Sequence, residues 1–128
     1  WTEMRGRASG IEVYVYSYGP HDNSRYRENL SFEAQHFLEV HGFSFSKIAT
    51  IINEARIDVL IDMKQHTENH ALSILAMRPC RVQVAWLGFP GSVGGGLADL
   101  IVGDAIVTPP EHSSFFDERL GLMPPSLT

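Results

Sequence analysis

The sequence predicts an α/β protein with a mainly parallel β-sheet and flanking helices. Segments with strand-like and helix-like patterns alternate along the chain, which is typical of this class. The segment "IDVLIDM" (57–63) is an almost continuous apolar run, as expected for a parallel strand covered on both faces. With 128 residues, 44% of them hydrophobic and 20% charged, the chain has the composition of a globular domain or of part of a larger one.

The N-terminal third predicts a strand, a turn and a helix. In 11–19, "IEVYVYSYG", aliphatic and tyrosine residues alternate, and this period of two indicates a strand. The cluster "GPHDNS" predicts a turn. The segment 25–40 is predicted to be helical at its centre, with Phe37 and Leu38 as its buried pair.

A more regular helix is predicted over 44–56. Ser46 is its expected N-cap. Its apolar residues recur at i, i+3, i+4 and i+7 and are Ile48, Ile51, Ile52 and Ala55. The buried strand over 57–63 follows directly, so this part of the chain indicates a helix–strand unit.

The C-terminal half predicts four further elements. A helix over 69–79 should stop near its final proline, because the residue before a proline disfavours helical geometry. Strands are expected over 81–89 and 98–107. A short helix over 109–121 would start at prolines and end at Gly121.

Charge and cysteine content exclude several protein classes. A formal net charge of -5 argues against a nucleic-acid backbone as main partner, because such binding needs a basic surface. One cysteine, Cys80, cannot form an intrachain disulfide and suits a reducing compartment. The start of the chain is no signal peptide, and we expect a cytoplasmic location, with the nucleus also open. The chain has no initiator methionine at position 1 and is expected to be a fragment of a longer protein.

The stretch "HTENH" places His66 and His70 four residues apart, as in a zinc-binding helix. A metalloprotease helix reads H-E-x-x-H, and here Glu68 comes one position too late to be its base. No third ligand stands at a fitting spacing. We therefore expect no metal here, and the competing interpretation is a helix cap with a surface side chain.

Two stretches follow strands at the edge where parallel sheets bind ligands. They are "KQHTENH" (64–70) and "GFPGSVGGG" (88–96), and together they could form the rim of one cleft. The glycines of the second stretch lack the G-x-G spacing of a dinucleotide fingerprint, and the next segment reads as a strand instead of a helix. A plain turn between two strands remains the alternative.

Three other residues have both a chemical and a structural interpretation. Asp62 at a strand end could be catalytic, but a capping role or an ion pair with Lys64 explains it equally well. Arg78 could reach a phosphate, and pairing with a carboxylate of the fold is favoured. Cys80 is expected to be a small buried residue and not a reactive thiol.

The ordered motifs of residues 57–124 resemble a known family. Asp62, then His66-Thr67, Arg78-Pro79, "WLGFPGS" with Gly94, "DLIVGD" and Pro109-Pro110-Glu111 follow one another as in the catalytic region of the protein O-linked N-acetylglucosamine transferases and their SPINDLY relatives. The run from Trp86 to Gly94 is the most specific part. Three departures are Gln65, where the family has a turn glycine, Phe89, where it has a tyrosine, and Cys80-Arg81, where it has Ala-Pro.

The resemblance implies a fold and an activity. Residues 1–128 would be part of the N-terminal, Rossmann-like lobe of a two-lobed GT-B glycosyltransferase. The C-terminal lobe and any tetratricopeptide repeats would lie outside this segment. The family transfers N-acetylglucosamine from UDP-GlcNAc to Ser or Thr of proteins, with inversion and without a metal. Alternatives are a SPINDLY-type protein O-fucosyltransferase and a non-catalytic α/β interaction domain.

The resemblance also implies where donor and acceptor would bind. The catalytic base would lie upstream of this segment, so none of its residues is expected to be catalytic. His70 would be a first-turn helix residue, and at Gly88 a side chain would fill space that sugar and acceptor share. The residues implied to line the cleft are His66, Thr67, Leu87, Gly88, Phe89, Pro90 and Gly91.

Overall fold

The computed structural model describes residues 10–86 and 88–124. The chain divides into two compact units, Trp1–Phe43 and Ser44–Thr128. Each unit has its own parallel sheet, of two strands in the first and four in the second. The predicted α/β class with parallel sheets is confirmed.

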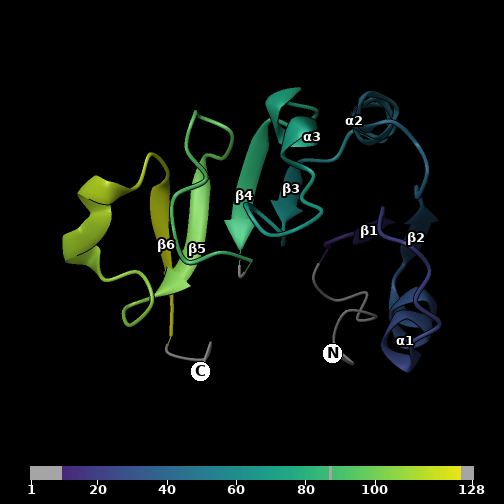
Figure 1. The fold of residues 1–128 in the computed structure, drawn as a ribbon, viewed down its shortest axis with the longest axis horizontal. Helices are drawn as coiled ribbons and strands as arrows, with labels where there is room; N and C mark the ends of the chain where they lie inside the picture. Colours follow the sequence, from purple (N-terminus) through teal and green to yellow (C-terminus); the bar gives the residue numbers. More distant parts are fainter. Residues whose placement is uncertain (1–9, 87, 125–128) are drawn as a thin grey trace. The chain divides into compact units, whose positions relative to one another are not determined.

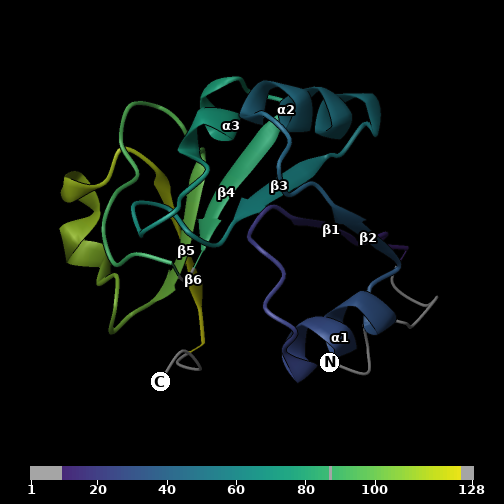
Figure 2. The same cartoon turned by 45° about the vertical axis from the view of Figure 1, so that its right-hand side comes forward.

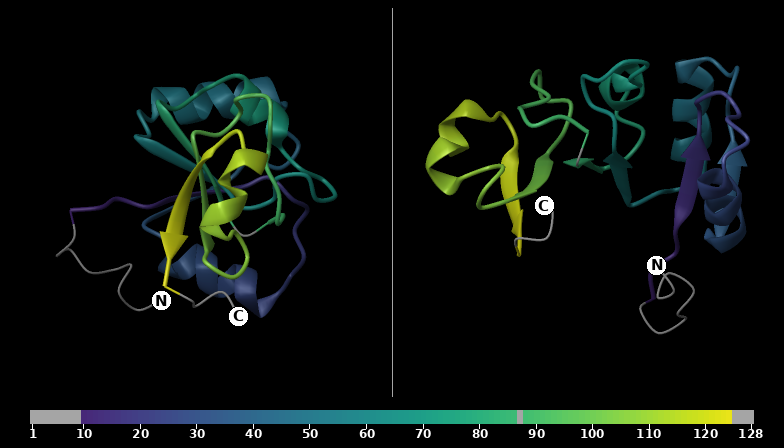
Figure 3. Two further views of the ribbon diagram at one scale, coloured as in Figure 1. Left: turned by 90° about the vertical axis from the view of Figure 1, so that its left-hand side faces the viewer. Right: turned by 60° about the horizontal axis from the view of Figure 1, so that its bottom comes forward.

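The first unit is a strand–helix–strand unit. Strand β1 (Tyr14–Ser17) lies parallel to strand β2 (His36–Glu39), and helix α1 (Arg25–Glu33) connects them, as the right-hand view of Figure 3 shows. The hydroxyl of Ser24 caps α1 by accepting a hydrogen bond from the Arg27 backbone N–H at 3.1 Å. The predicted strand over 11–19 is thus confirmed in its central part.

The prediction of one helix centred in 25–40 is wrong in its second half. Helix α1 ends at Glu33, and Ala34 has an extended backbone with φ −65° and ψ 139°. Residues 36–39 then form β2, because β1 offers them a complete parallel register. Phe37 and Leu38 are half-buried strand residues and not a buried helical pair. Tertiary pairing here overrides a local pattern that either structure could satisfy.

The second unit contains four parallel strands in the order β3-β4-β5-β6 (Figure 1). The strands are β3 (Val59–Asp62), β4 (Val82–Trp86), β5 (Leu100–Asp104) and β6 (Arg119–Met123). Its helices are α2 (Phe45–Glu54), α3 (Leu72–Ala76) and the 3-10 helix η2 (Pro110–Phe115). The strands predicted within 57–63, 81–89 and 98–107 are confirmed.

Helices α2 and α3 pack beside each other near β3 and β4 (Figure 2). The N-cap of α2 is Ser44 and not Ser46, because the Ser44 hydroxyl accepts from the backbone N–H of Lys47 at 3.2 Å. The buried face of α2 consists of Ile48, Ala49 and Ile52. Helix α3 is shorter than the predicted 69–79 and is followed by Arg78 at φ 50°, a left-handed conformation that no helix continues through.

The predicted helix over 109–121 is wrong beyond its first half. The 3-10 helix η2 ends at Phe115, and Gly121 lies inside strand β6 instead of ending a helix. Strand β5 provides the reason, since Gly121 pairs with Val102 and Leu120 with Ile101. The alternation of Leu120 and Leu122 is the sequence signal for this strand.

The hydrophobic core of the second unit lies on one face of the sheet. Leu75 of α3 packs with Ala85 and Ile101 of the central strands, together with Val93 and Ala98 from the loop between them. On the opposite face Val59 and Ile61 remain 47% and 49% exposed. The expectation that this strand is covered on both faces is therefore wrong for β3, because α3 and the loop cover one side. Among the residues in the described ranges, no helix is long and apolar enough to cross a membrane.

Candidate functional site

The turn after β3 brings the chain sharply back on itself. The carboxylate of Asp62 accepts hydrogen bonds from the backbone N–H of Gln65 at 2.7 Å and of Lys64 at 3.4 Å. Gln65 adopts φ 49°, a conformation that glycine takes without strain. Asp62 is thus the cap of this turn, which is the structural interpretation of that residue. Gln65 keeps the left-handed geometry that a turn glycine would adopt.

Gly88, just after β4, touches this turn with its backbone. A Cβ atom at Gly88 would lie 2.5 Å from the Met63 carbonyl oxygen and 2.7–2.8 Å from the Lys64 backbone. The first obstacle to a side chain at Gly88 is therefore the backbone of the neighbouring loop. The two loops at the carboxyl ends of β3 and β4 are held at backbone contact.

His66 joins the same two loops through its side chain. Its Nε2–H donates a hydrogen bond to the Val93 carbonyl at 2.8 Å, and its ring meets the Phe89 ring edge-on at 5.6 Å. The hydroxyl of Thr67 donates to the Lys64 carbonyl at 2.7 Å, inside the turn. The structure therefore brings the two predicted stretches together at one edge of the sheet.

The two histidines of "HTENH" do not share a helix face. Residues 66–70 form turns, and the helix begins at Leu72. His70 precedes α3 and is not in its first turn; its Nδ1 accepts from the Leu72 backbone N–H at 3.4 Å. Within the part of the chain that the structure describes, no group of three His, Cys, Asp or Glu side chains could hold a metal ion.

The loop 88–96 is more than the plain turn that the sequence left open. Because β4 and β5 are parallel, their connection must return along the sheet to the start of β5. It does so with Val93 and Ala98 buried in the core, and Gly94, Gly95 and Gly96 have positive φ values. Phe89 and Pro90 are exposed at the start of the loop. Leu87 lies outside the described residues.

Glu118 and Asp117, which the sequence analysis missed, hold this loop from the start of β6. The carboxylate of Glu118, only 5% exposed, accepts from Val93 N–H at 2.8 Å, Gly94 N–H at 3.1 Å and the Ser92 hydroxyl at 2.8 Å. Asp117 accepts from Gly95 N–H at 3.1 Å. These carboxylates lie in a segment predicted to be helical, so no local signal indicated their role.

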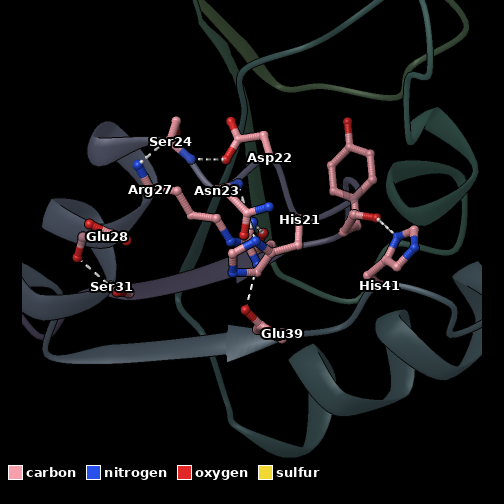
Figure 4. Close-up of polar contacts among 11 residues, drawn as sticks. His21, Asp22, Asn23, Ser24, Arg27, Glu28, Ser31, Glu39 and His41 are labelled. Carbon is pink, nitrogen blue, oxygen red and sulfur yellow. Dashed lines mark hydrogen bonds and ion pairs between the residues drawn. The ribbon is translucent and has the colours of Figure 1, made fainter.

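A second polar cluster lies at the carboxyl ends of β1 and β2 (Figure 4). Ser17 and Glu39 are the last residues of these strands. The Arg27 guanidinium donates to the Ser17 hydroxyl at 2.7 Å and to the Glu39 carboxylate at 2.6 Å, and it lies 5.5 Å from the centre of the Phe37 ring. The Arg27 side chain is 13% exposed, so this ion pair ties α1 to both strands.

The charges around Glu39 keep its carboxylate ionised. The hydrogen bond from Arg27 lowers the pKa of Glu39, and the charges of Arg27, His21 and His41 act in the same direction. His41 itself donates from Nδ1 to the Tyr18 carbonyl at 3.1 Å. Such a carboxylate is a hydrogen-bond acceptor for a hydroxyl or an amine. The sequence signal for this cluster is a histidine shortly after each strand, His21 after β1 and His41 after β2. It was missed because 36–39 was assigned to a helix.

The remaining candidate residues have structural roles. Arg78 pairs with Asp99 at 2.9 and 3.1 Å, which confirms the favoured interpretation. The hydrogen bond from Arg78 holds the pKa of Asp99 below its ordinary value, and the backbone N–H of Gln83 contributes to this shift. Cys80 is buried as predicted, and burial, followed by the charge of Asp58, raises the pKa of its thiol.

Comparisons with known proteins show what the chain is similar to. The chain is 36% identical over 114 residues to a probable UDP-N-acetylglucosamine–peptide N-acetylglucosaminyltransferase, SEC, of Arabidopsis thaliana, and this match covers 89% of the chain. It is 33% identical over 117 residues to a UDP-N-acetylglucosamine–peptide N-acetylglucosaminyltransferase of Caenorhabditis elegans, and this match covers 91% of the chain. The chain spans only 12% and 10% of these two relatives.

A solved structure shares the fold. The O-GlcNAc transferase of Thermobaculum terrenum, as its K341M mutant, superposes with a TM-score of 0.86 at 29% sequence identity. The match covers 95% of this chain and 23% of that one. The model of the family described as glycosyl transferase family 41 matches residues 3–128. The chain therefore belongs to glycosyl transferase family 41.

Proposed function

We propose that this chain is part of the N-terminal lobe of a protein O-glycosyltransferase that moves N-acetylglucosamine from UDP-GlcNAc to Ser or Thr of proteins. The observation that carries the proposal is the meeting of the His66 turn with the Gly88–Phe89 loop at the carboxyl ends of β3 and β4. Parallel sheets bind ligands at this edge. The named activity of the relatives supports the same reaction.

In this proposal the cleft is lined by His66, Thr67, Leu87, Gly88, Phe89, Pro90 and Gly91. The acceptor hydroxyl oxygen attacks the anomeric carbon of the sugar, the bond to the diphosphate breaks, and the configuration inverts. The hydroxyl proton goes to a base that this segment does not supply. The C-terminal lobe of the same protein holds the nucleotide, and no metal or other cofactor takes part. We place the protein in the cytoplasm, with the nucleus as a further location.

The chemistry of this chain is then mainly positional. Two loops held at backbone contact define a fixed edge against which sugar and acceptor can be oriented, and such orientation is a large part of catalysis. At this edge His66 can accept a hydrogen bond through Nδ1, because its Nε2–H already donates to the Val93 carbonyl. That nitrogen suits a hydroxyl of the sugar or of the acceptor.

Labelled-donor assays on the intact protein that contains this chain test the proposal. His66→Ala should lower the rate of N-acetylglucosamine transfer to a Ser/Thr peptide by at least about tenfold, because it removes a polar cleft contact. His70→Ala is the matched control and should leave the rate within about twofold. Unchanged transfer by folded His66→Ala would remove this edge from the active site.

The donor decides between the remaining functions. Incorporation from UDP-GlcNAc supports the proposal, whereas incorporation from a fucose donor alone would assign the SPINDLY-type fucosyltransferase reaction. No transfer from either donor by folded intact protein would favour a non-catalytic interaction domain.

A further inference from the structure

We infer that Glu118 is a positioning residue that holds His66 in the cleft through the backbone of Val93. The importance of that position rests on the proposed function, but the chain of contacts does not. Glu118 lies immediately before β6, at the opposite edge of the sheet from β3. Its influence on the turn after β3 therefore has to travel through the loop that crosses between β4 and β5.

Glu118 fixes that loop with three hydrogen bonds, which it accepts from three consecutive residues. One carboxylate oxygen accepts from the N–H groups of Val93 and Gly94 at 2.8 and 3.1 Å, and the other from the Ser92 hydroxyl at 2.8 Å. The residue is 5% exposed, so water cannot easily replace these bonds. Removing a buried acceptor leaves its donors unpaired, which costs more than the bond itself contributed.

Val93 connects Glu118 to His66, because contacts at three points fix its position. Its N–H is held by Glu118, its side chain is buried in the core, and its carbonyl accepts from His66 Nε2 at 2.8 Å. A residue fixed at these three points offers its carbonyl in one direction only. Loss of the Glu118 bonds would free the peptide groups on either side of Val93 and let that carbonyl turn away.

The bond to Val93 also selects the chemical form of His66. A carbonyl can only accept, so Nε2 carries the hydrogen, and Nδ1 is the acceptor of the neutral ring. The edge-on contact with Phe89 limits rotation of the ring. Glu118 thus keeps Nδ1 available for a ligand group that donates a hydrogen bond, which in the proposed reaction is a sugar or acceptor hydroxyl.

Asp117 provides the comparison that separates this role from general support of the loop. It binds the next residue along, Gly95, at 3.1 Å in an exposed hydrogen bond, and that contact does not lead to His66. If any bond to the loop were sufficient, both carboxylates would matter alike. If the path through Val93 matters, Glu118 alone controls the His66 ring.

The first experiment is a set of transfer assays on the intact enzyme. Glu118→Ala should lower kcat/KM by at least about tenfold and by no more than His66→Ala does, because Glu118 acts through the position of that ring. Glu118→Gln keeps a carbonyl for the two N–H groups and should stay within about threefold, as should Asp117→Ala. Glu118→Ala combined with His66→Ala should be no worse than the more impaired single variant, because residues acting in one path are non-additive. Multiplying losses would overturn the inference.

The second experiment observes His66 directly and needs no activity. Nuclear magnetic resonance of histidine-labelled protein should show a slowly exchanging Nε2–H proton of His66 in the parent, in Glu118→Gln and in Asp117→Ala, and should lose it in Glu118→Ala. If Glu118→Ala does not fold, Glu118→Asp takes its place, since the shorter side chain also withdraws from the loop. A retained signal would overturn the inference. If the signal is lost in Glu118→Ala but the parent protein has no transferase activity, the positioning role of Glu118 is upheld and the proposed function is rejected.

Discussion

The two parallel sheets present their carboxyl ends in different ways. At the end of β1 and β2 the groups that meet are charged side chains, with Arg27 joining Ser17 and Glu39. At the end of β3 and β4 the groups that meet are backbones, with Gly88 against the Met63 carbonyl. The first contact requires the charge of Arg27, whereas the second requires that residue 88 has no side chain. The two edges should therefore fail under different substitutions.

The largest effect should come from adding one carbon atom to the backbone contact. In Gly88→Ala the new Cβ would lie 2.5 Å from the Met63 carbonyl oxygen, so the backbone has to move. We expect a loss of roughly 3 kcal/mol in the free energy of unfolding, at the upper end for overpacking. Thermal or denaturant unfolding measures it.

Gly91→Ala is the control in the same loop. The atoms nearest to its Cβ would be those of the Phe89 ring, at 2.8 Å, and an exposed ring can turn aside. The loss should stay below about 1 kcal/mol. Equal losses for the two alanine variants would show that the backbone contact at Gly88 has no special importance.

Removing the charge at the other edge should have the next largest effect. Arg27→Met keeps much of the apolar stem but removes the bonds to Ser17 and Glu39, and we expect the melting temperature to fall by about 5 °C. Arg25→Met, on the exposed side of the same helix, should change it by less than about 2 °C. If the two methionine variants melt together, the ion pair does not hold this edge.

Gln65 offers a small gain in stability at the backbone edge. It adopts φ 49°, it is 0% exposed, and neither polar atom of its side-chain amide has a hydrogen-bond partner among the described residues. Gln65→Gly should remove the strain of the left-handed backbone and the cost of the unpaired amide. Glycine also makes the unfolded chain more flexible, which offsets part of this, so we expect a net gain of about 0.5 kcal/mol in the free energy of unfolding. Asn69→Gly, at φ 57° on an exposed residue, should gain less, because asparagine tolerates this conformation. A stability loss in Gln65→Gly would show that the buried amide is well accommodated.

The smallest effect concerns acid. The pKa of Asp99 is lowered by the hydrogen bond from Arg78, so Asp99 stabilises the fold above the ordinary aspartate pKa of about 3.9. That contribution is lost as the pH falls from there through the lowered folded value. Arg78→Gln should therefore flatten the stability profile below about pH 4 and change its slope little near pH 7. Parallel acid profiles for the two proteins would contradict the assignment.

The sequence predicted those elements whose pattern is local and missed those that depend on pairing with distant residues. Strands β3, β4 and β5 lie in mainly apolar segments whose pattern is visible locally in the sequence, and they were predicted. Residues 36–39 and 119–123 become strands only because β1 and β5 stand ready to pair with them, and they were not predicted.

The same distinction holds for the candidate site. The His66 turn and the glycine loop were expected to meet because parallel strands end at one edge, and they do. The contribution of Glu118 arises 25 residues from Val93 along the chain, where no spacing rule applies. Arg27 and Glu39 were missed because their meeting depends on β2, which had been assigned to a helix.

The order of strands in the second unit has a consequence for how the chain can assemble. Their order in the sheet, β3-β4-β5-β6, is also their order in the sequence. A chain emerging from the ribosome can therefore add each strand to one that is already exposed, without leaving a gap to be filled later. Strand β4 can pair with β3 through Val82 and Val59, β5 with β4 through Leu100 and Val84, and β6 with β5 through Arg119 and Leu100. Each step closes a loop of modest length, which keeps the entropic barrier of parallel pairing low during synthesis.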